Sequence, residues 1–174
     1  MKYIPLLFIL FFLACKQEQP QGGAKKSHPS HIYTYSTIDH SELKYYETDY
    51  VPVYSDIYHR DGTRRFMLTT TISIRNTSLT DSAYILEATY FDSYGEKLTE
   101  YIDSTILLSP LESIEFVVEE VEDIGGAGAN FIIHWGARKY SDQLLIQSIM
   151  IGSYGQQGIS FLSESKVIDA IKVE

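Results

Sequence analysis

The stretch FMLTTTISI, residues 66–74, decides the fold class of this chain. Its even-numbered positions hold mainly large apolar side chains, and the positions between them hold mainly small, hydroxyl-bearing ones. Because successive side chains of an extended chain point to opposite faces, this period of two predicts a β-strand with one buried face. The β-branched threonines and isoleucines favour the same conformation.

Short runs of the same kind recur along the chain, separated by turn-forming residues. We predict further strands over residues 51–58, 83–91, 97–102, 105–108, 113–119, 130–137, 144–151 and 159–163. Asp61-Gly62 and residues 92–95 are predicted hairpin turns. Residues 167–173 fit either a last strand or a frayed end, and no ten-residue window carries a helical stripe. This spacing predicts an all-β, antiparallel β-sandwich of the immunoglobulin-like kind, with a barrel as the alternative.

The start of the chain predicts export and a lipid anchor. Lys2 precedes an apolar run at residues 3–14, and the only cysteine, Cys15, follows directly. This run is shorter than the roughly 20 apolar residues that a membrane helix needs. We therefore predict a lipoprotein signal peptide over residues 1–14 and acylation of Cys15, with a cleaved signal and a free thiol as the alternative. Acyl chains on Cys15 would hold the protein at a membrane of the bacterial cell envelope, on its periplasmic face or outer surface.

The segment after the cysteine is predicted to be a flexible stalk. Residues 15–46 are polar, contain prolines and glycines, and hold few aliphatic side chains. The tyrosine-rich part from residue 32 onward could pack partly on the domain. The β-sandwich domain itself is expected over residues 47–174, and without a second cysteine it has no internal disulfide.

The net charge excludes one large class of partner. The formal charge is −9, and removal of Lys2 with the signal would make it one unit more negative. Such a surface repels phosphate backbones, so we expect no binding to nucleic acid.

Several sequence blocks together resemble one known family. They are VPVYSDIY (51–58), SIRNT (73–77), SPLESIEFVV (109–118), GGAGANF (125–131) and the two segments MIG and QQGISF within 150–161. In this order they resemble the bacterial lipoprotein family known as domain of unknown function 3124, over roughly residues 49–167. The resemblance implies no activity, because that family has none assigned.

Two glycine-rich segments are the first candidates for a ligand site. Each runs into a predicted strand and not into a helix, so structural turns are favoured over a phosphate-binding loop. For the second segment, which holds Gly152, Gly155 and Gly158, we expect a hairpin loop with positive backbone angles. If the two loops met at one end of the sandwich, nearby amides would complete a site. The candidate residues are Gly125, Gly126, Gly128, Asn130, Gln156, Gln157 and Gly158.

Metal-binding and catalytic patterns are weak. The acidic run Glu119, Glu120, Glu122 and Asp123 lacks the alternation of a calcium loop, and the histidines lack zinc-site spacing. The Ser-x-x-Lys pattern at residues 163–166 stands without its companion Lys-Thr-Gly, and no Gly-x-Ser-x-Gly motif occurs. We expect no metal, no cofactor and no catalytic residue.

The sequence thus predicts a membrane-tethered, non-catalytic recognition or accessory module of the cell envelope. Its partner would be another envelope protein or a glycan. The fourteen tyrosines fit recognition surfaces, although core and cross-strand packing is their commoner use. Two alternatives stay open: an envelope structural protein that assembles through a sheet edge, and a hydrolase whose site is built from distant residues, with His59 or His134 beside carboxylates.

Overall fold

The computed structural model describes residues 33–119, 125–140 and 144–173. The chain divides into two compact units, Met1–Ser30 and His31–Glu174, and every described residue belongs to the second. The predicted signal peptide, Cys15 and the first part of the stalk lie outside the described residues, as do Glu120, Glu122 and Asp123 of the acidic run.

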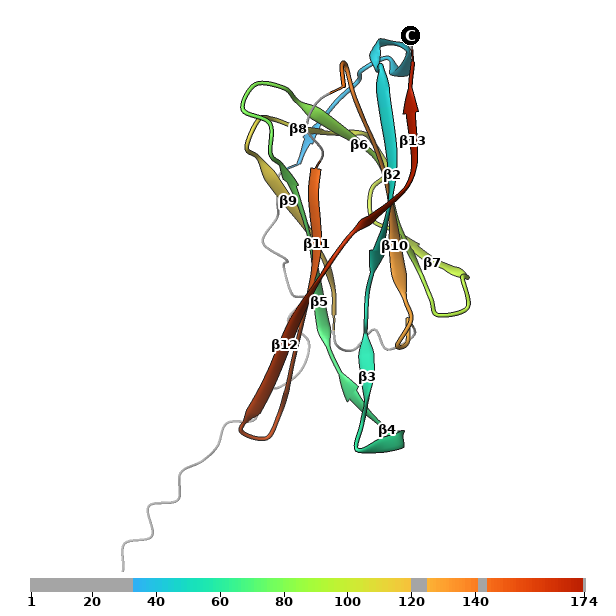
Figure 1. Cartoon of the computed structure of the whole chain (residues 1–174), viewed down its shortest axis with the longest axis vertical. Coiled ribbons are helices and arrows are strands. Elements are labelled where there is room, and N and C mark those ends of the chain that lie inside the picture. Colours follow the sequence, from blue (N-terminus) through green and yellow to red (C-terminus); the bar gives the residue numbers. More distant parts are fainter. Residues whose placement is uncertain (1–32, 120–124, 141–143, 174) are drawn as a thin grey trace, which may run out of the picture. The chain divides into compact units, whose positions relative to one another are not determined.

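The described residues form antiparallel sheets (Figure 1). The larger sheet has the order β1 (Thr34–Tyr35), β8 (Ile106–Leu108), β6 (Ala83–Phe91), β10 (Asn130–Ala137), β2 (Tyr45–Pro52), β13 (Lys166–Lys172), with β7 (Lys97–Glu100) also paired to β6. The smaller sheet has the order β12 (Gln157–Glu164), β11 (Leu144–Tyr154), β5 (Thr69–Asn76), β9 (Ser113–Val118). A separate hairpin consists of β3 (Asp56–His59) and β4 (Asp61–Met67).

One hydrophobic core is shared by strands of the two larger sheets. Ile72 and Ile74 of β5 and Trp135 of β10 are fully buried in it. Phe131 stacks on Tyr90 with ring centroids 4.9 Å apart. The predicted all-β fold of antiparallel sheets packed as a sandwich is confirmed, and in residues 66–74 the buried face includes Leu68 and Thr70 as the alternation predicts.

Several predicted strands coincide with the structure, but those predicted at 51–58 and 66–74 do not. The stretch 66–74 spans the end of β4, which ends at Met67, and most of β5, which begins at Thr69. Residues 83–91 and 130–137 are β6 and β10, and the undecided tail is strand β13. The single strand predicted at 51–58 is wrong, because β2 ends at Pro52 and β3 begins at Asp56. Proline has no N–H to donate to a neighbouring strand, which suits it to the end of β2.

The hairpin turn after β3 also differs from the prediction. Asp61 and Gly62, the predicted turn residues, are already part of β4. The turn is at Arg60, which has a positive φ of 66° although it is not a glycine. The register of β3 and β4 shifts after Tyr58, so that His59 pairs with Asp61 and Arg60 alone forms the tip.

The folded domain begins before the expected boundary at residue 47. Strand β2 starts at Tyr45, and a 3-10 turn over His40–Glu42 and strand β1 precede it. Leu43 and Tyr45 are 1% and 2% exposed. The later part of the predicted stalk therefore supplies core side chains. No helix in the described ranges is long and apolar enough to cross a membrane.

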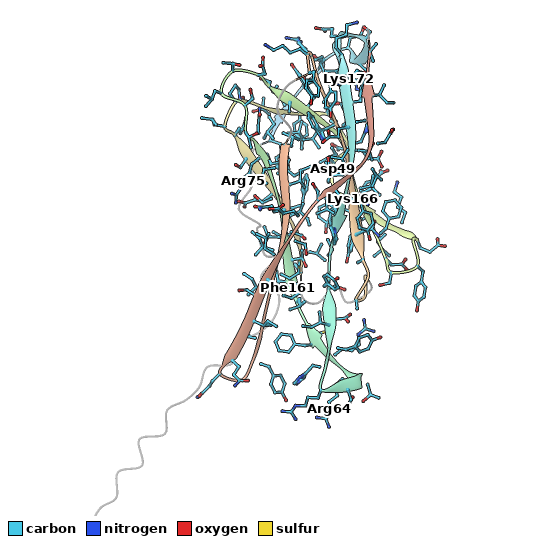
Figure 2. All side chains as sticks on the ribbon, viewed as in Figure 1. Asp49, Arg64, Arg75, Phe161, Lys166 and Lys172 are labelled. Atoms are coloured by element: carbon cyan, nitrogen blue, oxygen red, sulfur yellow. The ribbon has the colours of Figure 1, made fainter. Side chains whose placement is uncertain are left out.

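The last two strands connect the sheets. β12 pairs with β11 of the smaller sheet and β13 pairs with β2 of the larger one, and Figure 1 shows this ribbon, in dark red, passing from one to the other. Ser165 lies at the crossing, where its N–H donates to the Ile146 carbonyl and its hydroxyl donates to Asp49 Oδ1 at 2.7 Å. Asp49 is labelled near this crossing in Figure 2.

Candidate functional site

A pocket of about 420 Å³ lies between two hairpins that extend toward the same end of the domain (Figure 1). The β3–β4 hairpin and the end of the β11–β12 hairpin line it together. The lining residues are Ile57, Tyr58, His59, Arg60, Phe66, Tyr154, Gln157, Gly158 and Ile159. Its volume is within the range of roughly 300–1,000 Å³ that is common for small-molecule sites.

Gly152 allows the two hairpins to approach each other. A Cβ atom at this position would lie 2.4 Å from Phe66 Cε1 and 2.6 Å from the Met67 carbonyl oxygen. Since no side chain fits there, the backbone of β11 packs directly on the end of β4. The sequence prediction placed Gly152 in a loop, and the structure places it inside strand β11.

Aromatic rings form the walls of the pocket. The His59 ring lies 6.2 Å from Phe66 on its own hairpin and 6.1 Å from Tyr154 on the other, measured between centroids. Tyr58 and Tyr154 remain 59% and 70% exposed. Exposed tyrosines beside a pocket offer both an apolar face and a hydroxyl group to a ligand.

The acidic side chains of the β3–β4 hairpin already have partners. Arg65 Nε donates to Asp56 Oδ1 at 2.7 Å, and Arg65 Nη2 contacts the second oxygen of the same buried carboxylate. Asp61 accepts from the hydroxyl and the N–H of Thr63, and these hydrogen bonds lower the pKa of Asp61. None of the described residues that line the pocket is acidic.

The structure brings only part of the predicted ligand loop to this pocket. Gln157 and Gly158 line it, whereas Gln156, at the turn between β11 and β12, and the residues Gly125, Gly126, Gly128 and Asn130 do not. The two predicted glycine loops therefore do not line this pocket together.

Serine side chains hold the first glycine segment as a turn. Ser93 donates from its N–H and its hydroxyl to the Gly125 carbonyl, both at 2.9 Å, and Gly128 N–H donates back to the Ser93 hydroxyl at 2.8 Å. Ser55 donates to the Gly126 carbonyl. Asn130 is the first residue of β10, where it pairs with both neighbouring strands.

Positive backbone angles occur at fewer of these glycines than expected. Gly126 and Gly155 have φ values of 78° and 62°. Gly152 and Gly158 lie inside β11 and β12, so the expected loop conformation is right only for Gly155. Gly158 has space around it, since a Cβ atom at this position would come no closer than 3.7 Å to its nearest neighbour, the Gly152 carbonyl oxygen.

Most of the residues that line the pocket were not predicted from the sequence. His59, Arg60 and Tyr154 were not among the predicted site residues. The available signal was local: a Tyr-His-Arg triplet at one predicted turn and a tyrosine at the edge of another. Nothing in the sequence indicated that these turns would meet.

Two acidic side chains of β2 lie buried near the strand crossing. Glu47 and Asp49 are each 2% exposed. The Tyr45 hydroxyl donates to Glu47, and Trp135 Nε1 donates to Asp49 Oδ2 at 3.1 Å. Burial raises the pKa of Glu47, the neighbouring Asp49 raises it further, and the bond from Tyr45 opposes the shift. These carboxyl groups hold strands together and are not accessible to a substrate.

The buried carboxyl group predicts a pH-dependent stability. Because folding raises the pKa of Glu47, the folded state binds a proton more tightly than the unfolded state does. This stabilisation is complete below the pKa of Glu47 in the unfolded chain. It is lost as the pH rises through the pKa in the folded protein. Glu47→Gln mimics the protonated form. We expect the free energy of unfolding of this variant, relative to that of the wild type, to increase between pH 5 and pH 8. Urea unfolding at several pH values measures this difference.

Glu87→Gln, which changes an exposed carboxylate on β6, is the control for this experiment. Its difference from the wild type should stay constant over the same pH range. Parallel pH profiles for Glu47→Gln and the wild type would contradict the prediction.

The residues considered for a metal site or a hydrolase site make other contacts in the part of the chain that the structure describes. No three or more histidine, cysteine or acidic side chains are placed there to hold a metal ion. His134 instead stacks on Tyr46 and shares a hydrogen bond with Thr48. His59 lines the pocket and pairs across the hairpin with Asp61, whose carboxylate accepts from Thr63, and Ser163 lies in strand β12, not at the start of a helix.

The sheet edge required by the structural-protein hypothesis is present but carries protective features. β13 is the last strand of the larger sheet, and all of its residues are exposed, including Ile168 and Ile171. Lys166 and Lys172 flank these apolar side chains (Figure 2), and the pairing register shifts after Val167. Lysines and bulges on an edge strand discourage pairing with another chain.

Comparison with known proteins identifies one family. The family described as "Protein of unknown function (DUF3124)" matches residues 46–168, which is more than half of the chain. No curated protein matches. The crystal structure of Thermotoga maritima 1070 is similar with a TM-score of 0.39 and 10% sequence identity, covering 69% of this chain and 92% of that chain.

Proposed function

The chain belongs to the DUF3124 family of proteins of unknown function, and from this premise we propose that it is a membrane-tethered, non-catalytic recognition module of the bacterial cell envelope. The observation that carries the proposal is the pocket between the β3–β4 and β11–β12 hairpins. Its ligand would be an envelope component of the size of a few sugar rings.

The chemistry of the lining supports recognition more than catalysis. Rings from both hairpins provide stacking surfaces, and Gln157 and the tyrosine hydroxyls provide hydrogen bonds. General acid–base catalysis needs a side chain that accepts a proton from the reacting group. It also needs a second side chain that orients this base or acts as the general acid. The described lining residues include a single histidine and no carboxylate, and Asp61 opposite this histidine is engaged by Thr63, so a glycan-binding role fits these residues better than hydrolysis.

The tether of the proposed function rests on Cys15, which lies outside the described residues. We expect Cys15→Ala to remove the protein from the membrane fraction or to leave it as unprocessed precursor, because no thiol remains to accept a lipid. Cell fractionation and labelling with a fatty-acid analogue measure this. A variant that still fractionates with the membrane and still takes up the label would contradict acylation at Cys15.

Glycan-array binding of the detergent-solubilised protein tests the pocket. We expect Tyr154→Ala to weaken binding about tenfold, because it removes an exposed ring that forms one wall. Tyr94→Ala is the matched control, since Tyr94 is 92% exposed and does not line the pocket. Equal binding by the two variants, or no saccharide bound by the wild type, would refute the proposed role.

A further inference from the structure

We infer that the pocket between the β3–β4 and β11–β12 hairpins takes an acidic saccharide, whose carboxylate binds Arg60. The inference rests on the proposed function, and it adds the chemical class of the ligand and the residue that selects it. Arg60 lines the pocket at the tip of the β3–β4 hairpin.

The charges around Arg60 leave its guanidinium available. The two acidic side chains of this hairpin are already engaged, Asp56 by Arg65 and Asp61 by Thr63, with Arg64 Nε 3.9 Å away from Asp61. Among the described residues, Arg60 forms no ion pair. Of the described residues that line the pocket, Arg60 is the cation and none is acidic, and the nearby Asp61 already accepts from Thr63. The pocket therefore offers a guanidinium on a chain of net charge −9. The guanidinium gives an anionic ligand a local attraction at this pocket that opposes the repulsion from the net negative charge.

The backbone of Arg60 is a second observation at the same residue. Its φ of 66° lies in the left-handed region, which glycine and asparagine adopt more easily than arginine. A non-glycine residue is strained in this region, and such residues cluster at ligand sites. The chain places an arginine at the tip although glycine would be less strained there.

An arginine suits a carboxylate in particular. Its planar guanidinium can donate two parallel hydrogen bonds to the two carboxylate oxygens. The rings of His59, Phe66 and Tyr154 then offer faces for the apolar C–H side of a sugar ring, and Gln157 can bond its hydroxyl groups.

The shape of the site favours a compact saccharide over an acidic peptide. β-Rich proteins usually bind peptides as an added strand along a sheet edge, or in an elongated groove. This pocket is instead formed by side chains at the ends of two hairpins.

The test uses the full-length, detergent-solubilised protein and an array that pairs uronic-acid oligosaccharides with their carboxyl-reduced, neutral counterparts. Poly-glutamate is included as the acidic peptide. We expect the wild type to prefer the acidic member of at least one pair by about tenfold, since a charge-assisted contact discriminates on this scale. Arg60→Asn, which removes the charge but tolerates the left-handed backbone, should abolish the preference. Arg60→Lys should retain part of it.

Arg64→Gln is the matched control, because Arg64 lies on the same hairpin, near Arg60 in sequence, and does not line the pocket. Thermal unfolding confirms that each variant is folded. Equal binding of acidic and neutral members, with Tyr154→Ala still harmful, would overturn the inference and leave the proposed function standing. Binding of poly-glutamate in place of every saccharide, or a preference that Arg60→Asn leaves unchanged, would also overturn it. A wild type that binds no saccharide would refute both.

Discussion

A chain that begins at Glu47 is expected to remain largely unfolded, whereas one that begins at His31 should unfold cooperatively on heating. The shorter chain lacks β1, the 3-10 turn and the first two residues of β2. It also lacks two core side chains, Leu43 and Tyr45. Removal of one large buried side chain typically costs about 2–5 kcal/mol, and a domain of this size has only about 5–15 kcal/mol of stability in total.

Lost hydrogen bonds add to this cost. Lys44 N–H donates to the Ala137 carbonyl at the end of β10, and the Lys44 carbonyl accepts from Val173 N–H just after β13. Without residue 44, the ends of both neighbouring strands of β2 lose a partner. Tyr33, whose hydroxyl donates to the Glu115 carbonyl of β9, is also removed.

Circular dichroism and thermal unfolding of the two chains measure this effect. A chain that begins at Tyr33 provides the intermediate control, because it keeps every described residue at this end. If the chain that begins at Glu47 melted cooperatively within a few degrees of the one that begins at His31, residues 33–46 would not belong to the core in the way the structure indicates.

The misplaced boundary shows where local sequence patterns fail. β2 alternates buried and half-buried positions, but its buried positions include Glu47 and Asp49. An acidic residue at a buried position breaks the apolar pattern that predicts a strand. Its burial is possible because Trp135 and Ser165, distant in sequence, donate to Asp49. The sequence pattern of residues 45–50 alone could not reveal these partners.

Strands in the middle of the sheets were easier to predict. β6 and β10 begin and end where the pattern places them, because each buries one or both faces with large apolar side chains and is bounded by turn-forming residues. The same local pattern predicted turns at both hairpins that form the pocket. It could not predict that the turns approach each other, because that depends on contacts between β4 and β11.

The candidate ligand residues divide into two that line the pocket and others that lie elsewhere. Gln157 and Gly158 were selected because glycine-rich loops often carry function, and both line the pocket. Gly125, Gly126 and Gly128 were selected on the same ground, but the hydroxyl groups of Ser55 and Ser93 hold that segment as a turn. Glycine content alone did not distinguish a turn from a ligand site.

Gly152→Val is expected to destabilise the domain by about 3 kcal/mol or more, because the new side chain would overlap the end of β4. The first added carbon would lie 2.4 Å from Phe66 Cε1, 2.6 Å from the Met67 carbonyl oxygen and 2.8 Å from Leu68 Cδ2. The Phe66 ring could rotate away, but the carbonyl belongs to the backbone. Relief of the overlap therefore requires β4 to move from β11.

This movement would also open the pocket, since Phe66 lines it and belongs to β4. Gly152→Val should therefore lower the melting temperature and increase amide hydrogen exchange in β4, whereas Gly152→Ala should show the same changes to a smaller degree. Gly62→Ala is the control, because a side chain carbon at Gly62 in β4 would meet no atom within 4 Å. If Gly152→Val and Gly62→Ala melted at the same temperature, β4 would not pack on β11 through Gly152. The pocket would then lack the contact that brings its two hairpins together.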